Sequence, residues 1–97
     1  MAFRHIVLYK LKPEHRAELP EILAGFRGLA GRIDGLIGIE AGADELRSER
    51  SFDVALVATF RDRAAYEAYL DHPLHGPVRE RMHRVREASR SCDYETD

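Results

Sequence analysis

Two histidines and a tyrosine with the chemistry of proton transfer occur in separate parts of the sequence. His5 lies in an alternating run near the start, and Tyr69 and His75 lie on either side of a His-Pro break in the segment YLDHPLH. A neutral imidazole can remove a proton next to a carbonyl, and a second imidazole or a phenol can stabilise the enolate oxygen. These residues suit proton transfer on a carbonyl compound if the fold brings them together.

The first predicted element positions His5. Alternation from Phe3 to Leu11 predicts a strand. One face of this strand, which we expect helices to cover, carries His5, Val7 and Tyr9. The other face is apolar in its middle, at Ile6 and Leu8, so the strand is expected to be covered on both sides. His75 follows the break and can reach the face of His5.

The remaining pattern predicts an α+β fold. The expected elements are a helix over Leu19–Ile33 that ends at Asp34-Gly35, strands over Leu36–Gly42 and Ser51–Phe60, a helix capped by Asp62 and broken at His72-Pro73, a helix over Gly76–Arg90 and a strand over Ser91–Glu95. The two helices on either side of His72-Pro73 count as one helical segment in this pattern. The order is therefore strand, helix, strand, strand, helix, strand. This order predicts a ferredoxin-like βαββαβ subunit, with a four-stranded antiparallel sheet and helices on one face, as one domain over residues 1–97.

Both faces of the predicted sheet are apolar. One face carries Val7, Val54 and Leu56, and the other carries Ile6, Leu8, Ala55 and Val57. The helices of one chain can cover only one face, and a second copy of the sheet is the usual cover for the other. We therefore expect a homodimer through the sheet face that buries on the order of 1,200–2,000 Å².

Composition narrows the class of protein. The 97 residues are 44% hydrophobic and 33% charged, with a formal net charge of -2, which disfavours disorder and the basic surface of a nucleic-acid or anionic-membrane binder. The single cysteine, Cys92, allows no internal disulfide. No apolar run has the length of a signal peptide or a membrane span. We expect a cytoplasmic protein without nucleic-acid or membrane partners.

Four segments resemble the stress-responsive A/B barrel domain family, which belongs with the dimeric α+β barrel proteins. They are FRHIVLYKLKP, GLIGIEAG, RSFDVALVATF, and YEAYLDHPLHGPV followed by CDYE. The resemblance covers essentially the whole chain, and its most specific parts are the first-strand histidine and the Tyr-x-x-His-Pro-x-His segment. It implies a ferredoxin-like subunit whose sheet packs against that of its mate to form an eight-stranded barrel.

The resemblance also implies roles for individual residues. The family includes plant stress proteins that form very stable assemblies and a polyketide cyclase. In the cyclase members, the histidines that match His5 and His75 are acid/base groups and the tyrosine that matches Tyr69 assists them. Phe26 and Val54 stand where that enzyme has a tyrosine and a histidine, so the resemblance does not extend to its substrate.

Three functions of different classes follow. The first is a small-molecule site between helices and sheet, with His5 and His75 as polar groups and an apolar lining of Val7, Tyr9, Phe26 and Leu56. The second is a non-catalytic protein that acts through its stable oligomer, in which the histidines only brace the turn around Pro73; an accessory domain for another enzyme is a third. An enclosed volume of about 300 Å³ or more would favour the first function.

No cofactor or metal is expected. Asp71, His72 and His75 could approach a cation, but no further clustered ligand completes a set, and nothing marks a haem ligand. Cys92 is interpreted as a small strand residue rather than a nucleophile. The basic residues between Arg79 and Arg90, and His83 with them, are interpreted as a solvated, salt-bridged helix face because Glu80 and Glu87 interleave with them.

Overall fold

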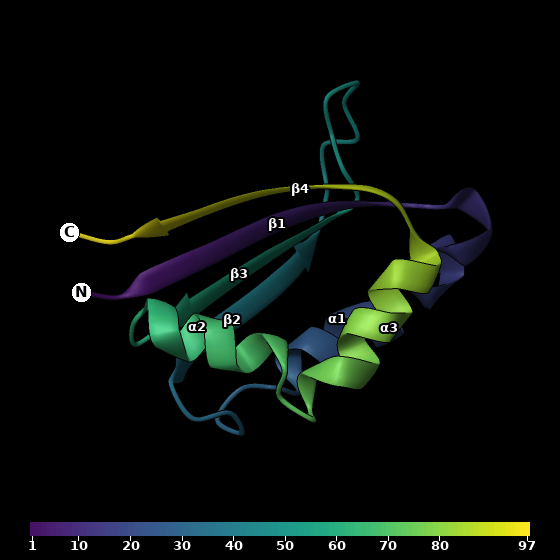
Figure 1. Ribbon diagram of the computed structural model, residues 1–97. Coiled ribbons are helices and arrows are strands. Elements are labelled where there is room, and N and C mark those ends of the chain that lie inside the picture. The colour runs from purple at the N-terminus through teal and green to yellow at the C-terminus, as the bar shows by residue number, and fades with distance from the viewer.

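Four strands form one antiparallel sheet, and three α-helices lie on one of its faces (Figure 1). The computed structural model describes residues 1–97. Its elements are β1 (Phe3–Leu11), a 3₁₀ helix (Pro13–Glu18), α1 (Leu19–Arg27), β2 (Leu36–Ala43), β3 (Val54–Phe60), α2 (Arg63–Leu70), α3 (His75–Val85) and β4 (Arg86–Glu95). The strand order is β2-β3-β1-β4. The predicted ferredoxin-like subunit is therefore confirmed.

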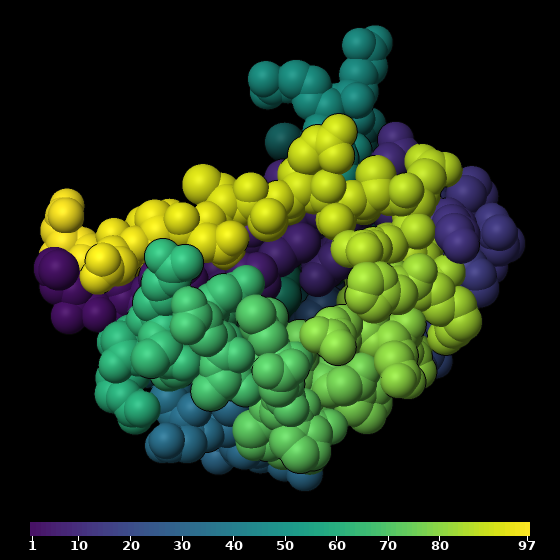
Figure 2. Space-filling model, viewed as in Figure 1, coloured from purple at the N-terminus to yellow at the C-terminus, as the bar shows by residue number.

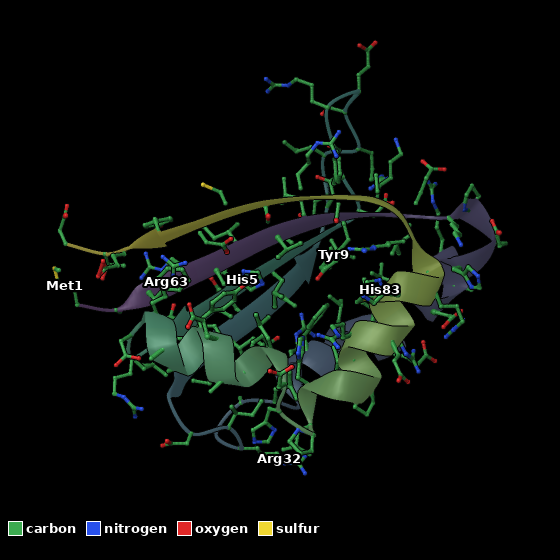
Figure 3. All side chains as sticks on the ribbon, viewed as in Figure 1. Met1, His5, Tyr9, Arg32, Arg63 and His83 are labelled. Atoms are coloured by element: carbon green, nitrogen blue, oxygen red, sulfur yellow. The ribbon has the colours of Figure 1, made fainter.

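β1 is a central strand, and its alternation separates two surfaces. On the helix side, Val7 and Tyr9 are buried together with Ile22 and Phe26 of α1. Figure 3 shows His5 and Tyr9 on the helix side of β1. A second buried cluster lies around Tyr69, where α2 packs against the other end of the sheet. The helix side of β1 therefore forms one wall of the candidate site.

The opposite face of the sheet has no helix over it. Leu8 on β1 is 40% exposed, and Ala55 pairs with it from β3. Ile6 and Val57 form the neighbouring cross-strand pair and are half-buried. The alternation predicts apolar side chains on both sides of the sheet, and the single chain leaves this second surface open. None of the three α-helices is long and apolar enough to span a membrane.

The first helix is shorter than predicted. α1 ends at Arg27 rather than near Ile33, and Leu29 and Ile33 are instead buried in the turns that follow. Leu29 and Ile33 continue the apolar spacing of the helix because both side chains face the core. That spacing therefore predicts a longer helix than the structure has. The chain then turns at Gly35, where φ is +84° and an added Cβ would lie 2.6 Å from the Cβ of Ala65. Only glycine fits this position.

The boundary between α3 and β4 also differs from the prediction. α3 ends at Val85, and β4 begins at Arg86 rather than at Ser91. Arg86 pairs with Leu11 at the far end of β1. The backbone groups of a central strand need partners along its whole length, so the pairing with β1 prevails over the local helical pattern.

Two aspartates fix the ends of elements. Asp62 caps α2 as predicted, because its Oδ1 accepts a hydrogen bond from the Ala65 amide at 2.8 Å. Asp53 has a role that the sequence pattern does not indicate. Its carboxylate is buried at the start of β3, where it accepts hydrogen bonds from the Leu11 amide at 2.7 Å and from the Arg47 guanidinium at 2.8 Å. Asp53 therefore ties the β2–β3 loop to the end of β1.

Replacing Asp53 with alanine is expected to lower the free energy of unfolding by about 2–3 kcal/mol, because the Leu11 amide loses its charged acceptor. Burial raises the pKa of Asp53, but the Leu11 amide and the Arg47 guanidinium outweigh it and hold the pKa below its usual range. The contribution is thus complete above the ordinary aspartate pKa and is lost as the pH falls through the lowered one. Urea unfolding of Asp53→Ala and wild type at neutral and acidic pH measures both effects.

Asp34→Ala is the control, because Asp34 is 96% exposed and its nearest ion-pair contact, with Arg61, is 3.7 Å long. It should change the free energy of unfolding by less than about 0.5 kcal/mol. Equal stability of the two variants would show that Asp53 does not hold the loop.

Candidate functional site

A cavity of about 220 Å³ lies between α3 and the helix-facing side of β1 and β4. Figure 2 shows the hollow beside β4, between that strand and helices α2 and α3. Its apolar lining comprises Val7, Tyr9, Phe26, Leu70, Val78 and Met82. The volume is below the roughly 300 Å³ typical of a site for drug-sized ligands and equals that of about seven waters at ~30 Å³ each. The cavity therefore suits a small molecule.

His75 is the first residue of α3 and is 7% exposed. Its Nδ1 lies 3.3 Å from the Leu70 carbonyl; a carbonyl can only accept, so Nδ1 carries the proton and Nε2 keeps its lone pair. Its ring stacks on that of Tyr69, with the centroids 4.0 Å apart. Burial lowers the pKa of His75, and Arg79 and His5 lower it further. His75 is thus a neutral imidazole with a free nitrogen at the cavity.

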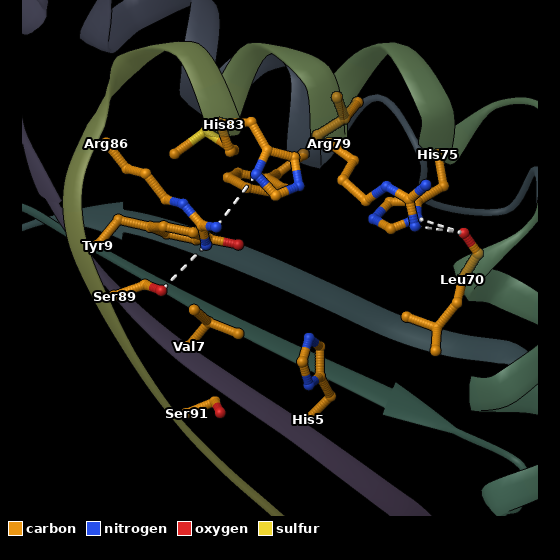
Figure 4. Close-up of a pocket in the computed structure, with 13 residues that line it drawn as sticks. His5, Val7, Tyr9, Leu70, His75, Arg79, His83, Arg86, Ser89 and Ser91 are labelled. Atoms are coloured by element: carbon orange, nitrogen blue, oxygen red, sulfur yellow. Dashed lines mark hydrogen bonds between the residues drawn. The ribbon is translucent and has the colours of Figure 1, made fainter.

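His5 reaches the same cavity from β1 (Figure 4). Its Nδ1 is paired with the carboxylate of Asp93, the residue opposite it on β4. Because a carboxylate accepts the Nδ1 proton, Nε2 of His5 is the nitrogen left for a ligand. The alternation of the last predicted strand indicates which face Asp93 occupies, but its pairing with His5 depends on a register that one strand alone does not reveal.

Two of the predicted site residues do not line the cavity. Tyr69 is 1% exposed and lies beneath the His75 ring, where burial raises the pKa of its phenol and keeps it protonated. Leu56 is also 1% exposed and belongs to the core on β3. The cavity opens on the β4 side of β1, whereas Leu56 pairs with Val7 on the β3 side. Val7, Tyr9 and Phe26 do line it.

The basic residues of α3 divide into two groups. Arg84 and Arg81 pair with Glu18, Arg84 through two hydrogen bonds of 3.0 and 3.1 Å. This is a salt-bridged surface as interpreted, although its acid comes from the 3₁₀ helix. Arg79 and His83, in contrast, line the cavity. Both are exposed to solvent, as interpreted, although α3 also turns them toward the cavity, which the interpretation did not include.

Residues around the His-Pro break hold the turn. The Leu74 amide donates a hydrogen bond of 3.0 Å to Nδ1 of His72. No three histidine, cysteine or carboxylate side chains gather where they could hold a metal ion. His72 therefore has a structural partner within its own turn.

The fold and the cavity define a class of protein: a ferredoxin-like α+β domain with a small histidine-containing cavity between sheet and helices. The sequence pattern of the stress responsive A/B barrel domain matches residues 3–96, and the chain belongs to that family. A stress-response A/B barrel domain-containing protein of Arabidopsis thaliana is 33% identical over 76 residues, which cover 75% of this chain and 67% of the relative.

Solved structures share the fold over almost the whole chain. A dimeric protein of ferredoxin-like fold from Bacteroides fragilis is 25% identical, with a TM-score of 0.81 and coverage of 98% of this chain and 96% of that one. A hydroxynitrile lyase from Passiflora edulis is 18% identical, with a TM-score of 0.85 and coverage of 99% and 94%. At 18% identity, the similarity to the lyase shows that the two chains share a fold.

Proposed function

We propose that the protein is a cytoplasmic homodimeric enzyme that moves a proton on a small carbonyl compound, with one cavity in each subunit. The observation that carries the proposal is the pair of imidazoles at one cavity, each with Nδ1 engaged and Nε2 free. Fixed tautomers are what a general acid–base pair needs. The hydroxynitrile lyase from Passiflora edulis, an enzyme that shares this fold, is consistent with such chemistry.

The two histidines have different environments and therefore different roles. His75 is buried and neutral, so its Nε2 takes the proton from the carbon next to the carbonyl. The C–H electron pair forms the enolate double bond, and a proton on Nε2 of His5, whose Nδ1 is paired with Asp93, is donated in a hydrogen bond to the oxygen. After the His75 proton has exchanged with solvent, delivery of the solvent-derived proton to the same carbon gives exchange, and delivery of a proton to another carbon gives isomerisation. Tyr69 supports the His75 ring from below.

Proton exchange on a panel of carbonyl compounds tests this proposal. Small aldehydes, ketones and oxo acids are incubated in D₂O with wild type, and loss of the signal of the proton next to the carbonyl is followed by NMR. We expect acceleration for at least one compound and at least a tenfold loss in Val78→Phe, because Val78 lines the cavity and a larger side chain fills it.

Ala24→Leu is the matched control, since it enlarges an exposed residue of α1 outside the cavity. It should exchange protons like wild type. No acceleration by wild type with any compound, or full activity in Val78→Phe, would contradict the proposal.

The homodimer is proposed to form through the open face of the sheet. That face carries apolar side chains on both central strands, with Leu8 40% exposed in the single chain. A shallow groove of about 370 Å³ lies beside Leu8, bordered by Phe52 and Ala55. The relative from Bacteroides fragilis is described as dimeric. Sedimentation should therefore give twice the chain mass of 11.1 kDa.

A non-catalytic oligomer is the second candidate. The small volume of the cavity favours it, because 220 Å³ is below the roughly 300 Å³ expected of a ligand site. Under this alternative the dimer forms but wild type accelerates no exchange. The two experiments above therefore separate the candidates.

A further inference from the structure

We propose that the substrate carries a carboxylate and that Arg86 binds it at the end of the cavity opposite His75. This inference rests on the proposed function and specifies its substrate class. It concerns a group of polar residues that the acid–base pair does not use: Arg86, His83 and Ser89.

The cavity has two chemically different ends (Figure 4). His5 and His75 lie at one end, and Arg86 lies near Tyr9 at the other. The register agrees, because Asp93 is opposite His5 whereas Ser89 is opposite Tyr9. His5 and Tyr9 are four residues apart on β1, about 13 Å at roughly 3.3 Å per residue. The long side chain of Arg86 brings its guanidinium closer to the histidines than this spacing along β1. One small molecule can therefore face a histidine base with one end and the guanidinium with the other.

Arg86 is held in place by neutral groups. It donates one hydrogen bond to the Ser89 hydroxyl at 3.0 Å and another to Nδ1 of His83 at 3.1 Å. Arginine can only donate, so the lone pair on Nδ1 of His83 accepts this hydrogen bond. These two contacts leave further N–H donors of the guanidinium unused. The side chain is thus oriented before any ligand arrives.

The charge of Arg86 has no carboxylate partner. Its side chain is half-buried, yet it forms no ion pair, whereas Arg84, in the last turn of α3, is paired with Glu18. No aspartate or glutamate lines the cavity, and nearby Asp93 is engaged by His5. Arg79 adds a second positive charge to the lining and donates to the Leu70 carbonyl. A partly buried cation is stabilised by an anion, so the lining favours an anionic ligand.

A carboxylate matches this end in geometry as well as charge. Its two oxygens can accept parallel hydrogen bonds from one guanidinium, and such charge-assisted bonds are stronger than neutral ones. With the carboxylate on Arg86, the rest of a short chain extends along Val7 toward His5 and His75. The substrate class that satisfies both ends is a small oxo acid, whose acidic C–H group lies at the histidines.

The test compares two probes of nearly equal shape, benzoate and benzamide, by NMR titration of the intact protein. We expect benzoate to shift resonances of cavity residues and to bind at least tenfold more tightly than benzamide. Arg86→Gln should remove this preference, and Arg86→Lys, which keeps the charge without the planar fork, should retain part of it. Arg32→Gln is the control, because Arg32 is exposed, lies outside the cavity and forms no ion pair (Figure 3).

Each other outcome overturns the inference. Equal affinity for the two probes would show that the cavity does not select an anion, and a preference that persists in both Arg86 variants would place the anion elsewhere. If neither probe binds, the cavity does not bind small carboxylates, and the inference is wrong. None of these results changes the exchange assay on neutral aldehydes and ketones, so the proposed function is judged separately.

Discussion

Replacing His75 with glutamine is expected to lower the rate of proton exchange by about 10²–10⁴, the usual contribution of a positioned general base. Glutamine can still donate a hydrogen bond to the Leu70 carbonyl, as the imidazole does at 3.3 Å. It cannot take up a proton at neutral pH. The substitution therefore removes the base while preserving a polar side chain at the start of α3.

The pH dependence of wild type tests the same assignment. The groups around His75 are the Leu70 carbonyl and the Tyr69 ring from α2, Arg79 from α3 and His5 from β1. Burial, Arg79 and His5 hold the pKa of His75 below its ordinary value of about 6.5. The base thus stays neutral to lower pH than a free imidazole, and on the acid side the exchange rate should fall only as the pH drops through the lowered pKa of His75.

His15→Gln is the control for His75→Gln. His15 bonds with Glu18 at 2.7 Å on the 3₁₀ helix and takes no part in the cavity. It should exchange protons like wild type at every pH. An exchange rate in His75→Gln above one tenth of the wild-type rate would show that another group is the base.

Side-chain periodicity predicts much of this fold because burial follows it. The alternation of β1 was confirmed over its full predicted length, Phe3–Leu11, and the cap at Asp62 was confirmed by its hydrogen bond to the Ala65 amide. The start of β4 was missed because residues 86–90 pair with a strand remote in sequence. Local pattern carries no information on such pairing.

The candidate site could be predicted only in part, for the same reason. Alternation places His5 on the helix side of β1, and the His-Pro break predicts His75 in the turn before the next helix, of which it is the first residue in the structure. Whether a helical residue faces the core or the cavity depends on how the helix sits on the sheet. Tyr69 is consequently buried beneath His75, and Arg86 enters the lining from a strand that was predicted to be helix.

Replacing Leu8 with glutamate is expected to dissociate the proposed dimer. Leu8 lies at the centre of the open face, between Ala55 on β3 and Arg90 on β4. In a two-fold interface each substitution occurs twice, and removing a carboxylate from water costs several kcal/mol, which pairing with Arg90 offsets only in part. We expect the dissociation constant to rise by more than 100-fold, with a single-chain mass in sedimentation at micromolar concentration.

The free chain of Leu8→Glu should stay folded, because the new carboxylate faces Arg90 across the strands and can pair with it in water. Ala24→Glu adds the same charge on the exposed side of α1 and should remain dimeric. A dimeric mass for Leu8→Glu would show that the sheet face is not the interface.

Loss of the dimer should also slow proton exchange, although Leu8 does not line the cavity. Leu8 lies between Val7 and Tyr9, whose side chains form the cavity wall on the other face of the same strand. In the proposed dimer the partner sheet would keep water from the backbone of β1 and would restrain its edge neighbour β4, which contributes Ser89 and Arg86 to the cavity. A monomer with an unrestrained β4 would hold His5, Asp93 and Arg86 less firmly. We therefore expect dimerisation and exchange to be lost together in Leu8→Glu and retained together in Ala24→Glu.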